Sequence, residues 1–227
     1  MTPQRIIPRG VLLFVRHGET DWNAAGRLQG RRDTSLNPRG RRQAEIAGRT
    51  LAGLGARPHA LRWLASPLSR TRLTMEIMRA AMGLDPADYV TDARLAEISF
   101  GRWEGMTWKE IRACAPQAHA ARKASPWTFT PPGGESYAAV AARLAPLLAE
   151  LAGDAVIVSH GGVARALLAL ACGLPPDEAA HAPVWQGRVL RIDACGYRWL
   201  PEGLPPGHGD APLLAGADAA GGEAPQA

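Results

Sequence analysis

Two histidines stand in matching local contexts and are the clearest candidates for chemistry. His17 comes one arginine after an apolar run at 11–15 and is followed by a glycine, and His160 ends a second apolar run at 155–159 and is followed by two glycines. A glycine after each histidine lets the backbone approach a ligand, and the start of a following helix offers N–H donors to an anion. The repeated pattern favours one shared anion-binding site over two unrelated structural histidines.

An arginine and a glutamate elsewhere in the chain are weaker candidates for the same site. Arg70 lies at a loop-to-helix junction after a third apolar run, 60–66, and Glu97 comes just before a Gly-containing segment, 101–105. Each also has an ordinary interpretation: Arg70 as a solvated residue at a helix start, and Glu97 as a surface carboxylate after a short strand. The residues alone leave both alternatives open.

The elements that must position these residues alternate between strands and helices. Continuous apolar runs predict buried strands over 11–15, 60–66 and 155–160. Apolar spacing and capping residues predict helices over 37–54, 71–83, 140–151 and 161–172. Such alternation predicts an α/β fold, a three-layer sandwich with a mostly parallel central sheet flanked by helices. Ligands bind beyond the carboxyl ends of strands in such sheets, which is where both histidines fall.

The rest of the chain completes a single domain over 1–200. An antiparallel pair with its turn at Cys195-Gly196 is predicted over 188–194 and 197–200, a short strand over 94–98 and a short helix over 107–114. Prolines and glycines break up 98–135, which predicts an irregular cap segment over the carboxyl ends of the strands. Residues 201–227 are rich in Pro, Gly and Ala and are predicted to form a mobile tail.

The composition is that of an ordinary globular protein. The 227 residues are 46% hydrophobic and 21% charged, which argues against a disordered, collagenous or membrane protein. Cys114, Cys172 and Cys195 form no C-x-x-C pair, so neither a disulfide framework nor a Cys/His metal site is expected. The apolar runs are too short for a membrane span or a signal peptide. We therefore expect a cytoplasmic protein.

The basic excess is concentrated near His17. The chain carries 26 basic and 21 acidic side chains, a net charge of +5. Seven arginines and three acidic residues in 16–42 account for +4 of this charge. No pattern of basic and aromatic residues resembles a nucleic-acid-binding module. The excess is therefore interpreted as attraction for a small anionic ligand, with neither nucleic acid nor a membrane as a partner.

Seven short blocks surround the candidate residues: VRHGETDWN, GRLQG, LNPRGRRQA, SPLSRTRLT, LAEISFGRWEG, PPGGES and VSHGGVAR. Together, over 11–193, they resemble the histidine phosphatase superfamily, also called the phosphoglycerate-mutase-like family. A single RHG triplet would carry little weight, but separate blocks in the family's order are a specific signal. The resemblance implies the α/β fold derived above and a phosphoryl-transfer reaction.

The resemblance also implies a role for each candidate. His17 would be the nucleophile that becomes phosphohistidine, with its other ring nitrogen held as a donor to a backbone carbonyl. Glu97 would be the general acid that protonates the leaving alkoxide and then accepts a proton from water. The other implied residues surround the phosphoryl group or line the pocket mouth: Arg16, Arg70, His160, Asn23, Gly161, Gln29 and Gly30. Because arginine and histidine supply the positive charge, no metal ion or other cofactor is implied.

Three features separate a phosphatase from a mutase of the same family. The segment after Glu97 is short, Gly162 stands where mutases usually carry Asn, and Gln29 stands where they tend to carry a small hydroxyl residue. All three resemble the phosphatase branch, so we expect a phosphomonoesterase acting on a small phosphorylated metabolite. A phosphoglycerate mutase and a non-catalytic interaction domain on the same fold are the alternatives, and the complete set of catalytic-type residues speaks against the second.

Substrate choice is assigned to the cap segment, 98–135. Its basic residues either meet a second anionic group of the substrate or form a solvated face, which is the favoured interpretation: Arg102, Lys109, Arg112, Arg122 and Lys123. Its large aromatic residues are interpreted mainly as packing against the sheet: Trp103, Trp108, Trp127 and Phe129. The oligomeric state stays open, with a homodimer as one alternative.

Overall fold

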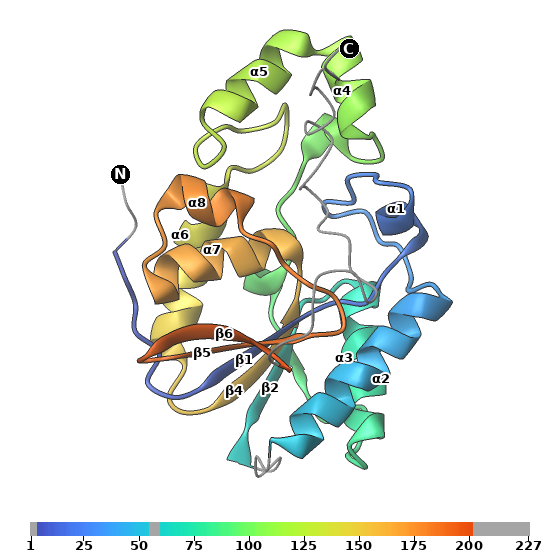
Figure 1. The fold of residues 1–227 in the computed structure, drawn as a ribbon, viewed down its shortest axis with the longest axis vertical. Helices are drawn as coiled ribbons and strands as arrows, with labels where there is room; N and C mark the ends of the chain where they lie inside the picture. Colours follow the sequence, from blue (N-terminus) through green and yellow to red (C-terminus); the bar gives the residue numbers. More distant parts are fainter. Residues whose placement is uncertain (1–3, 55–59, 202–227) are drawn as a thin grey trace, which may run out of the picture.

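The central sheet is mostly parallel, as predicted. The computed structural model describes residues 4–54 and 60–201, and within them six strands form one sheet in the order β3-β2-β4-β1-β5-β6 (Figure 1). The strands are β1 (Leu12–Arg16), β2 (Arg62–Ala65), β3 (Val90–Thr91), β4 (Ala155–Ser159), β5 (Val189–Asp193) and β6 (Gly196–Leu200). The pairs among β1 to β4 are parallel, whereas β5 is antiparallel to both β1 and β6.

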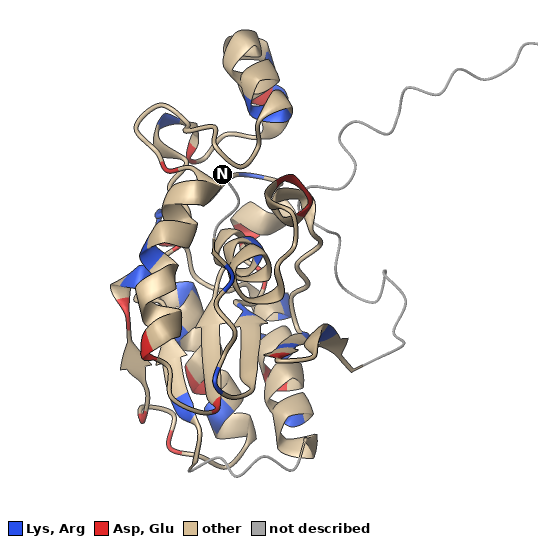
Figure 2. Cartoon of the chain, turned by 90° about the vertical axis from the view of Figure 1, so that its left-hand side faces the viewer, with Lys and Arg blue, Asp and Glu red and all other residues tan. Residues whose placement is uncertain are grey.

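Helices cover both faces of the sheet and make the predicted three-layer sandwich (Figures 1 and 2). One face carries α2 (Pro38–Gly53) and α3 (Ser69–Ala81), and the other carries α6 (Tyr137–Glu150), α7 (Gly161–Cys172) and α8 (Pro176–His181). Successive side chains of a strand point to opposite faces. Accordingly, Leu13 and Val15 belong to the core under α2 and α3, whereas Leu12 and Phe14 belong to the core under α6 and α7.

The residues at the ends of α2 and α7, two helices that border the site, explain where these helices begin and end. α2 begins after Asn37, whose side chain accepts a hydrogen bond from the Gly40 N–H, and Pro38 occupies the first helical position. α7 follows β4 directly and is buried over 161–171, as expected for a helix whose residues are apolar except for Arg165. It ends at Gly173, whose φ of 74° closes the helix in the left-handed region. His160, between β4 and α7, is therefore held by two buried elements.

The cap segment contains more helix than predicted. The predicted helix over 107–114 is present as α4 (Trp108–Cys114), but the next residues form α5 (Pro116–Ala124), which was not predicted. Figure 1 shows α4 and α5 grouped together, apart from the sandwich helices. Trp103 and Ile111 form a small core there, with Trp108 and Phe129 packed against it. Trp103, Trp108 and Phe129 therefore pack within the cap and not against the sheet as predicted, whereas Trp127 joins the core under α6 and α7.

The predicted strand over 94–98 is wrong. Residues Ala93–Leu95 form a 3₁₀ turn, because the Asp92 carboxylate accepts a hydrogen bond from the Arg94 N–H at 2.8 Å. The Arg143 side chain donates to the carbonyl oxygens of Arg94 and Ala96, so these groups need no strand partner. The strand that pairs with β2 is instead the short β3.

The last predicted elements of the domain are present, with a small shift at one turn. β5 and β6 form the predicted antiparallel pair, with Ala194 and Cys195 at the turn in place of Cys195 and Gly196. α8 was not predicted. The predicted tail, 201–227, lies outside the described residues from residue 202 onward. In the described part of the chain, every helix is too short or too polar to cross a membrane.

Candidate active site

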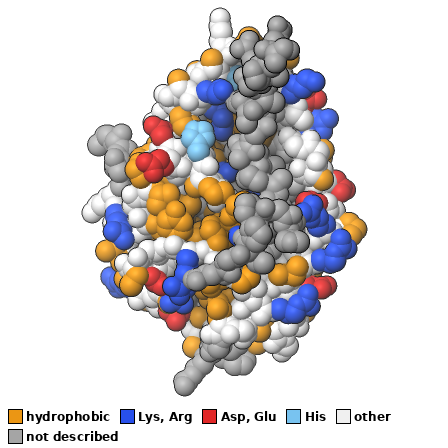
Figure 3. Space-filling model, viewed as in Figure 1, with side chains coloured by type: hydrophobic (Ala, Val, Ile, Leu, Met, Phe, Trp, Pro, Cys, Tyr) orange, Lys and Arg blue, Asp and Glu red, His pale blue; other side chains and the backbone are white. Residues whose placement is uncertain are grey.

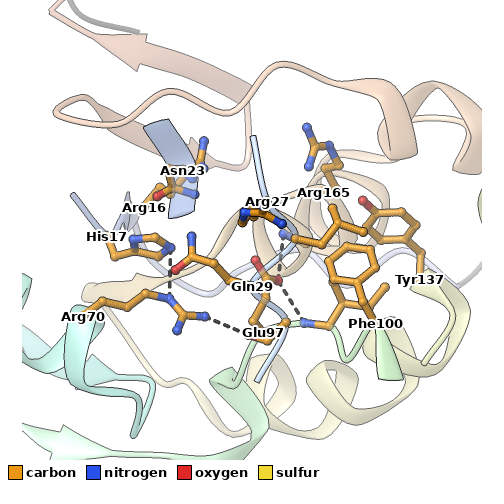
Figure 4. A pocket seen from close by; sticks show the side chains of 15 residues that line it. Arg16, His17, Asn23, Arg27, Gln29, Arg70, Glu97, Phe100, Tyr137 and Arg165 are labelled. Carbon is orange, nitrogen blue, oxygen red and sulfur yellow. Dashed lines mark hydrogen bonds between the residues drawn. The ribbon is translucent and has the colours of Figure 1, made fainter. Parts of the chain in front are cut away.

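A pocket lies where β1 and β4 end, at the edge of the sheet where the sequence placed both histidines. It encloses about 540 Å³, part of it open to solvent. Figure 4 shows the side chains that line it. The lining consists of Arg16, His17, Asn23, Arg27, Leu28, Gln29, Gly30, Arg70, Glu97, Ile98, Phe100, Tyr137, Gly161, Gly162 and Arg165. All the predicted site residues are among these except His160, whose ring lies next to that of His17.

The hydrogen bonds of His17 define its tautomer. His17 Nδ1 lies 2.7 Å from the carbonyl oxygen of Gly18, and a carbonyl oxygen only accepts, so Nδ1 carries the proton. Nε2 faces the pocket and accepts a hydrogen bond from Arg70 Nε at 3.3 Å (Figure 4). Burial, aided by Arg70 and Arg16, holds the pKa of His17 well below its ordinary value of 6.5. His17 therefore presents an unprotonated nitrogen, with the backbone carbonyl partner that the sequence predicted.

Arg70 is fully buried in the first turn of α3, which excludes the solvated interpretation. Its two terminal nitrogens donate to the carbonyl oxygens of Arg32, at 2.7 Å, and Gly30, at 2.8 Å. Gly30 presents its carbonyl from a left-handed backbone conformation, with φ of 51°. The loop that contains Gln29 and Gly30 thus fixes the guanidinium beside His17.

His160 pairs with His17 at the base of the site. The two imidazole centroids are 5.2 Å apart, with one ring edge toward the other. His160 Nε2 is hydrogen-bonded to Ser66 Oγ at 2.7 Å, and the buried Nδ1 has no partner among the described residues. Burial, followed by the charges of nearby arginines, lowers the pKa of His160 well below 6.5. Two uncharged imidazoles therefore share a pocket with several guanidinium groups.

Glu97 is a pocket carboxyl group, not a surface one. Its Oε1 accepts hydrogen bonds from the backbone N–H groups of Ile98, at 2.9 Å, and Gly162, at 3.0 Å. Burial raises the pKa of Glu97 above its ordinary value of 4.5, although these bonds and nearby arginines oppose the change. A Cβ atom on Gly162 would lie 2.5 Å from Glu97 Oε1, so this contact requires glycine.

The remaining predicted residues also lie at the pocket. Asn23 Oδ1 accepts hydrogen bonds from Thr20 N at 3.2 Å and Gln186 Nε2 at 3.1 Å, which leaves the Asn23 amide nitrogen to donate to a ligand. Gln29 Oε1 accepts a short hydrogen bond from Thr34 Oγ1. Gly161 is the first residue of α7, so the N–H groups at this helix start are directed at the pocket.

Several pocket residues were missed by the sequence reasoning. Arg27, Phe100, Tyr137 and Arg165 line the pocket, whereas none of the basic residues proposed from the cap segment does. Arg165 had a usable signal: it lies four residues after Gly161 on a predicted helix, and such residues share a face. Gln186, which donates to both the His17 carbonyl oxygen and Asn23, follows no motif that would mark it.

Three of the seven arginines in the basic segment, 16–42, are next to acidic side chains away from the pocket. Arg31 pairs with Glu135 at 3.0 Å, Arg32 lies 3.7 Å from Glu104, and Arg39 pairs with Glu19. Of the seven arginines in 16–42, only Arg16 and Arg27 line the pocket. In the face seen in Figure 3, basic and acidic side chains are interspersed around the edge of the molecule. The positive field on a ligand therefore comes from a few inward-facing residues.

The pocket chemistry supports anion binding by protein donors. Within 4–54 and 60–201, no cluster of His, Cys, Asp and Glu side chains is arranged to hold a metal ion. Arginine side chains, the Asn23 amide and the α7 N-terminus supply donors to the oxygens of a phosphoryl group. An unprotonated imidazole nitrogen and a carboxyl group with a raised pKa stand in the same pocket, as nucleophilic transfer with general acid catalysis requires.

Several known proteins are similar to this chain in sequence and in fold. Residues 12–204 match the family described as histidine phosphatase superfamily (branch 1). The chain is 39% identical over 180 residues to a glucosyl-3-phosphoglycerate phosphatase of Mycolicibacterium vanbaalenii, covering 74% of this chain and 76% of that protein. It is 32% identical over 187 residues to a 2,3-bisphosphoglycerate-dependent phosphoglycerate mutase of Chelativorans, covering 78% and 89%. The native structure of the mycobacterial glucosyl-3-phosphoglycerate phosphatase matches with a TM-score of 0.69 and 33% identity, covering 84% of this chain and 95% of that one.

Proposed function

The chain belongs to the histidine phosphatase superfamily, and we propose that it hydrolyses a small phosphorylated metabolite through a phosphohistidine formed on His17. Membership of this family, together with relatives named as phosphatases, makes it a phosphoric monoester hydrolase. The observation that carries the proposed course of reaction is the hydrogen bond from His17 Nδ1 to the Gly18 carbonyl oxygen. That bond leaves Nε2 unprotonated and aimed at the pocket.

The first step transfers the phosphoryl group to the enzyme. His17 Nε2 attacks phosphorus and forms the P–N bond while the bond from phosphorus to the ester oxygen breaks. Glu97, whose protonated form is favoured because burial raises its pKa, gives its proton to the leaving alkoxide. The alcohol departs, and Glu97 is left as a carboxylate.

The second step returns the enzyme to its starting state. Water attacks the phosphohistidine, Glu97 accepts a proton from that water, and the P–N bond breaks. Inorganic phosphate leaves, His17 is again neutral, and Glu97 is again protonated. The same carboxyl group therefore serves first as acid and then as base.

Charge on the transferring phosphoryl group is met by fixed donors. We assign Arg16, Arg70 and His160 to its equatorial oxygens, with the Asn23 amide nitrogen and the Gly161 N–H as further donors. Gln29 and Gly30 shape the pocket mouth, and the Gly30 carbonyl oxygen holds Arg70. Donors positioned in advance in a pocket of low polarity stabilise the transition state more than mobile water does.

We further propose that the reaction needs no metal ion or other cofactor, because these donors already cover the phosphoryl oxygens. The proposal includes a cytoplasmic location and no nucleic-acid or membrane partner, on the charge and cysteine pattern of the sequence. A homodimer is compatible with this proposal.

A mutase relative makes phosphoglycerate mutase the competing activity. Gly162 argues for hydrolysis: any side chain there would begin 2.5 Å from both Glu97 Oε1 and Ile98 Cγ2, so the Asn usual in mutases does not fit beside this Glu97. With 3-phosphoglycerate as the substrate, we expect release of phosphate to exceed formation of 2-phosphoglycerate. Faster isomerisation than hydrolysis would favour the mutase.

A direct assay tests the proposed hydrolysis. The purified protein should hydrolyse p-nitrophenyl phosphate at an unchanged rate after dialysis against EDTA. The His17→Ala variant, folded as judged by circular dichroism, should lose this activity, and Arg102→Ala serves as the matched control because Arg102 is exposed and outside the pocket. Loss of activity on chelation would contradict metal independence, and full activity of the His17 variant would contradict the mechanism.

A further inference from the structure

Arg165 is a buried arginine whose charge the proposed chemistry does not use. The residue is only 6% exposed, and its Nε donates to the Ala182 carbonyl oxygen at 3.0 Å. No acidic side chain among the described residues forms an ion pair with it. Burying a charge without a counter-ion is costly, and such residues mark functional sites. Because Arg165 lines the pocket, a bound anion is the natural partner for its charge.

Arg165 lies close to the place assigned to the phosphoryl group. Arg165 Nη1 is 3.5 Å, and Arg16 Nε 3.7 Å, from the position that a Cβ atom of Gly161 would occupy. The two guanidinium groups are therefore neighbours across the start of α7. An anionic group bound by Arg165 would be separated from the phosphoryl group by only a short chain of atoms.

The surroundings of Arg165 differ from the phosphoryl end of the pocket. In Figure 4, Arg165 and Tyr137 lie on the opposite side of the pocket from His17 and Arg70, with Phe100 below Tyr137. Tyr137 and Phe100 offer apolar ring surface, and Tyr137 adds one hydroxyl group. This end of the pocket is suited to the carbon part of a metabolite and to one polar group on it.

The charges on this side favour a singly charged group over a second phosphate. Arg27, the other arginine not assigned to the phosphoryl group, donates to the Gly105 carbonyl oxygen at 2.6 Å and pairs with Glu110 at 3.3 Å. Among the described residues that line the pocket, Arg165 is thus the arginine left to balance a second group, and a single guanidinium balances a single negative charge. A planar guanidinium matches a planar carboxylate through two parallel hydrogen bonds.

From these observations we infer that Arg165 binds a carboxylate of the substrate, so that the protein prefers phosphomonoesters of small hydroxy acids. The inference rests on the proposed hydrolysis and deepens it, because it assigns the substrate class. Arg165 acts in this account as a specificity-determining residue, and the phosphoryl group is bound by the residues named above. A competing role for Arg165 is direct contact with the phosphoryl oxygens.

Three substrates that differ at one carbon distinguish binding of a carboxylate by Arg165 from contact of Arg165 with the phosphoryl oxygens. In 3-phosphoglycerate, glycerol 3-phosphate and glycerol 1,3-bisphosphate, the carbon remote from the reacting phosphate carries a carboxylate, a hydroxyl group or a second phosphate. We expect kcat/KM of the wild-type protein to be at least about tenfold higher for 3-phosphoglycerate than for glycerol 3-phosphate, as a charged bidentate contact implies. A ratio near one, or a preference for the bisphosphate, would overturn the inference without any variant.

Variants then assign the preference to Arg165. In Arg165→Met the ratio of kcat/KM for 3-phosphoglycerate to glycerol 3-phosphate should fall to near one, whereas Arg102→Met, which removes an exposed arginine outside the pocket, should keep the wild-type ratio. Arg165→Lys, which retains the charge and most of the volume, should show an intermediate ratio and carries the test if the Met variant does not fold. An equal loss on both substrates in either variant would place Arg165 on the phosphoryl group and overturn the inference.

Failure of the inference is distinguishable from failure of the proposed function. A wild-type protein that hydrolyses p-nitrophenyl phosphate but shows no carboxylate preference retains the proposed function and refutes the role of Arg165. A wild-type protein that hydrolyses neither p-nitrophenyl phosphate nor any of the three substrates refutes the proposed function itself.

Discussion

At the scale of residues, burial sets opposite protonation states on His17 and Glu97. It favours the uncharged form of each group, which for histidine means loss of the proton and for glutamate means its retention. The pKa of His17 is lowered and that of Glu97 is raised for this reason. Burial therefore favours an unprotonated nucleophile and a protonated acid in one pocket, and the charges of Arg70 and Arg16 add to this effect at His17.

The pH dependence of kcat/KM for an alkyl phosphate follows from these shifts. The lowered pKa keeps His17 neutral below 6.5, and the rate should fall only when the pH drops through that lowered pKa. The raised pKa keeps Glu97 protonated above 4.5, and the rate should fall as the pH rises through it. In Glu97→Gln the alkaline limb should disappear and the maximum should drop by about 10²–10⁴-fold.

A comparison of leaving groups checks that assignment. p-Nitrophenolate needs little protonation, so Glu97→Gln should reduce the first step much less with p-nitrophenyl phosphate than with glycerol 3-phosphate. Equal losses on both substrates, with an unchanged alkaline limb, would show that Glu97 is not the acid. The titration of the substrate is common to both enzymes and cancels in the comparison.

Gln186 is expected to position Asn23 and the backbone of the nucleophile. Its Nε2 donates to the His17 carbonyl oxygen and to Asn23 Oδ1, each at 3.1 Å, and so fixes which side of the Asn23 amide faces the ligand. Gln186→Leu should weaken inhibition by orthovanadate by roughly 3–10-fold, the value of about one hydrogen bond. Inhibition constants of Gln186→Leu, Asn23→Ala and the double variant measure this, and the double variant should bind no more weakly than Asn23→Ala. Fully additive losses would contradict the positioning role.

The residues that the sequence predicted are those that follow a buried strand or a recognisable motif. His17, His160 and Gly161 come directly after β1 or β4, so strand ends alone place them together. Tyr137 and Gln186 depend on the register of a helix start and on the path of a later loop, which spacing along the chain does not define, whereas Arg165 could have been found from its spacing to Gly161. None of the basic residues of the cap segment lines the pocket, which argues against the alternative in which they meet a second anionic group of the substrate.

At the scale of elements, the junction of β4 and α7 connects the nucleophile to the acid. It carries His160 beside His17, and the N–H of Gly162 in the first turn of α7 holds Glu97. The two sides of the site meet at this junction, although their residues are far apart in sequence. A substitution in the first turn of α7 should therefore displace the Glu97 side chain more than it disturbs packing of the core.

Gly162→Ala tests this junction. The added Cβ would lie 2.5 Å from Glu97 Oε1 and from Ile98 Cγ2, so Glu97 must move and lose its hydrogen bond to the helix. We expect kcat for alkyl phosphates to fall about tenfold or more, with a smaller fall for p-nitrophenyl phosphate. Gly53→Ala is the matched control, because nothing lies within 4 Å of a Cβ atom at the exposed end of α2. Wild-type activity in Gly162→Ala would show that Glu97 does not depend on this contact.

The elements missed or wrong in the sequence analysis were short ones. α5 and α8 begin at Pro116 and Pro176, and proline is typical of the first helical position, so a start signal was present in both. The strand expected over 94–98 failed because the Arg143 and Asp92 side chains satisfy backbone groups there. Strongly apolar elements such as β1, β4 and α7 were predictable because burial alone defines them.

At the scale of the whole molecule, the net charge of +5 is not a uniform property of the surface. Arg31, Arg32 and Arg39 are next to carboxylates, while Arg16, Arg70 and Arg165 are buried and face one pocket. Buried positive charge in a pocket attracts anions more strongly than the same charge in water. The molecule therefore concentrates its anion affinity at the end of the sheet where His17 stands.

The central claim, that hydrolysis passes through a phosphohistidine on His17, has one direct measurement. The enzyme is mixed with p-nitrophenyl phosphate, quenched in alkali within the first turnover, digested and analysed by mass spectrometry, with His17→Ala and Glu97→Gln in parallel. The account predicts one added phosphoryl group on the peptide that contains His17, lost on exposure to acid, greater in Glu97→Gln and absent in His17→Ala. Turnover with no phosphorylated His17, or a phosphoryl group trapped on another residue, would contradict it.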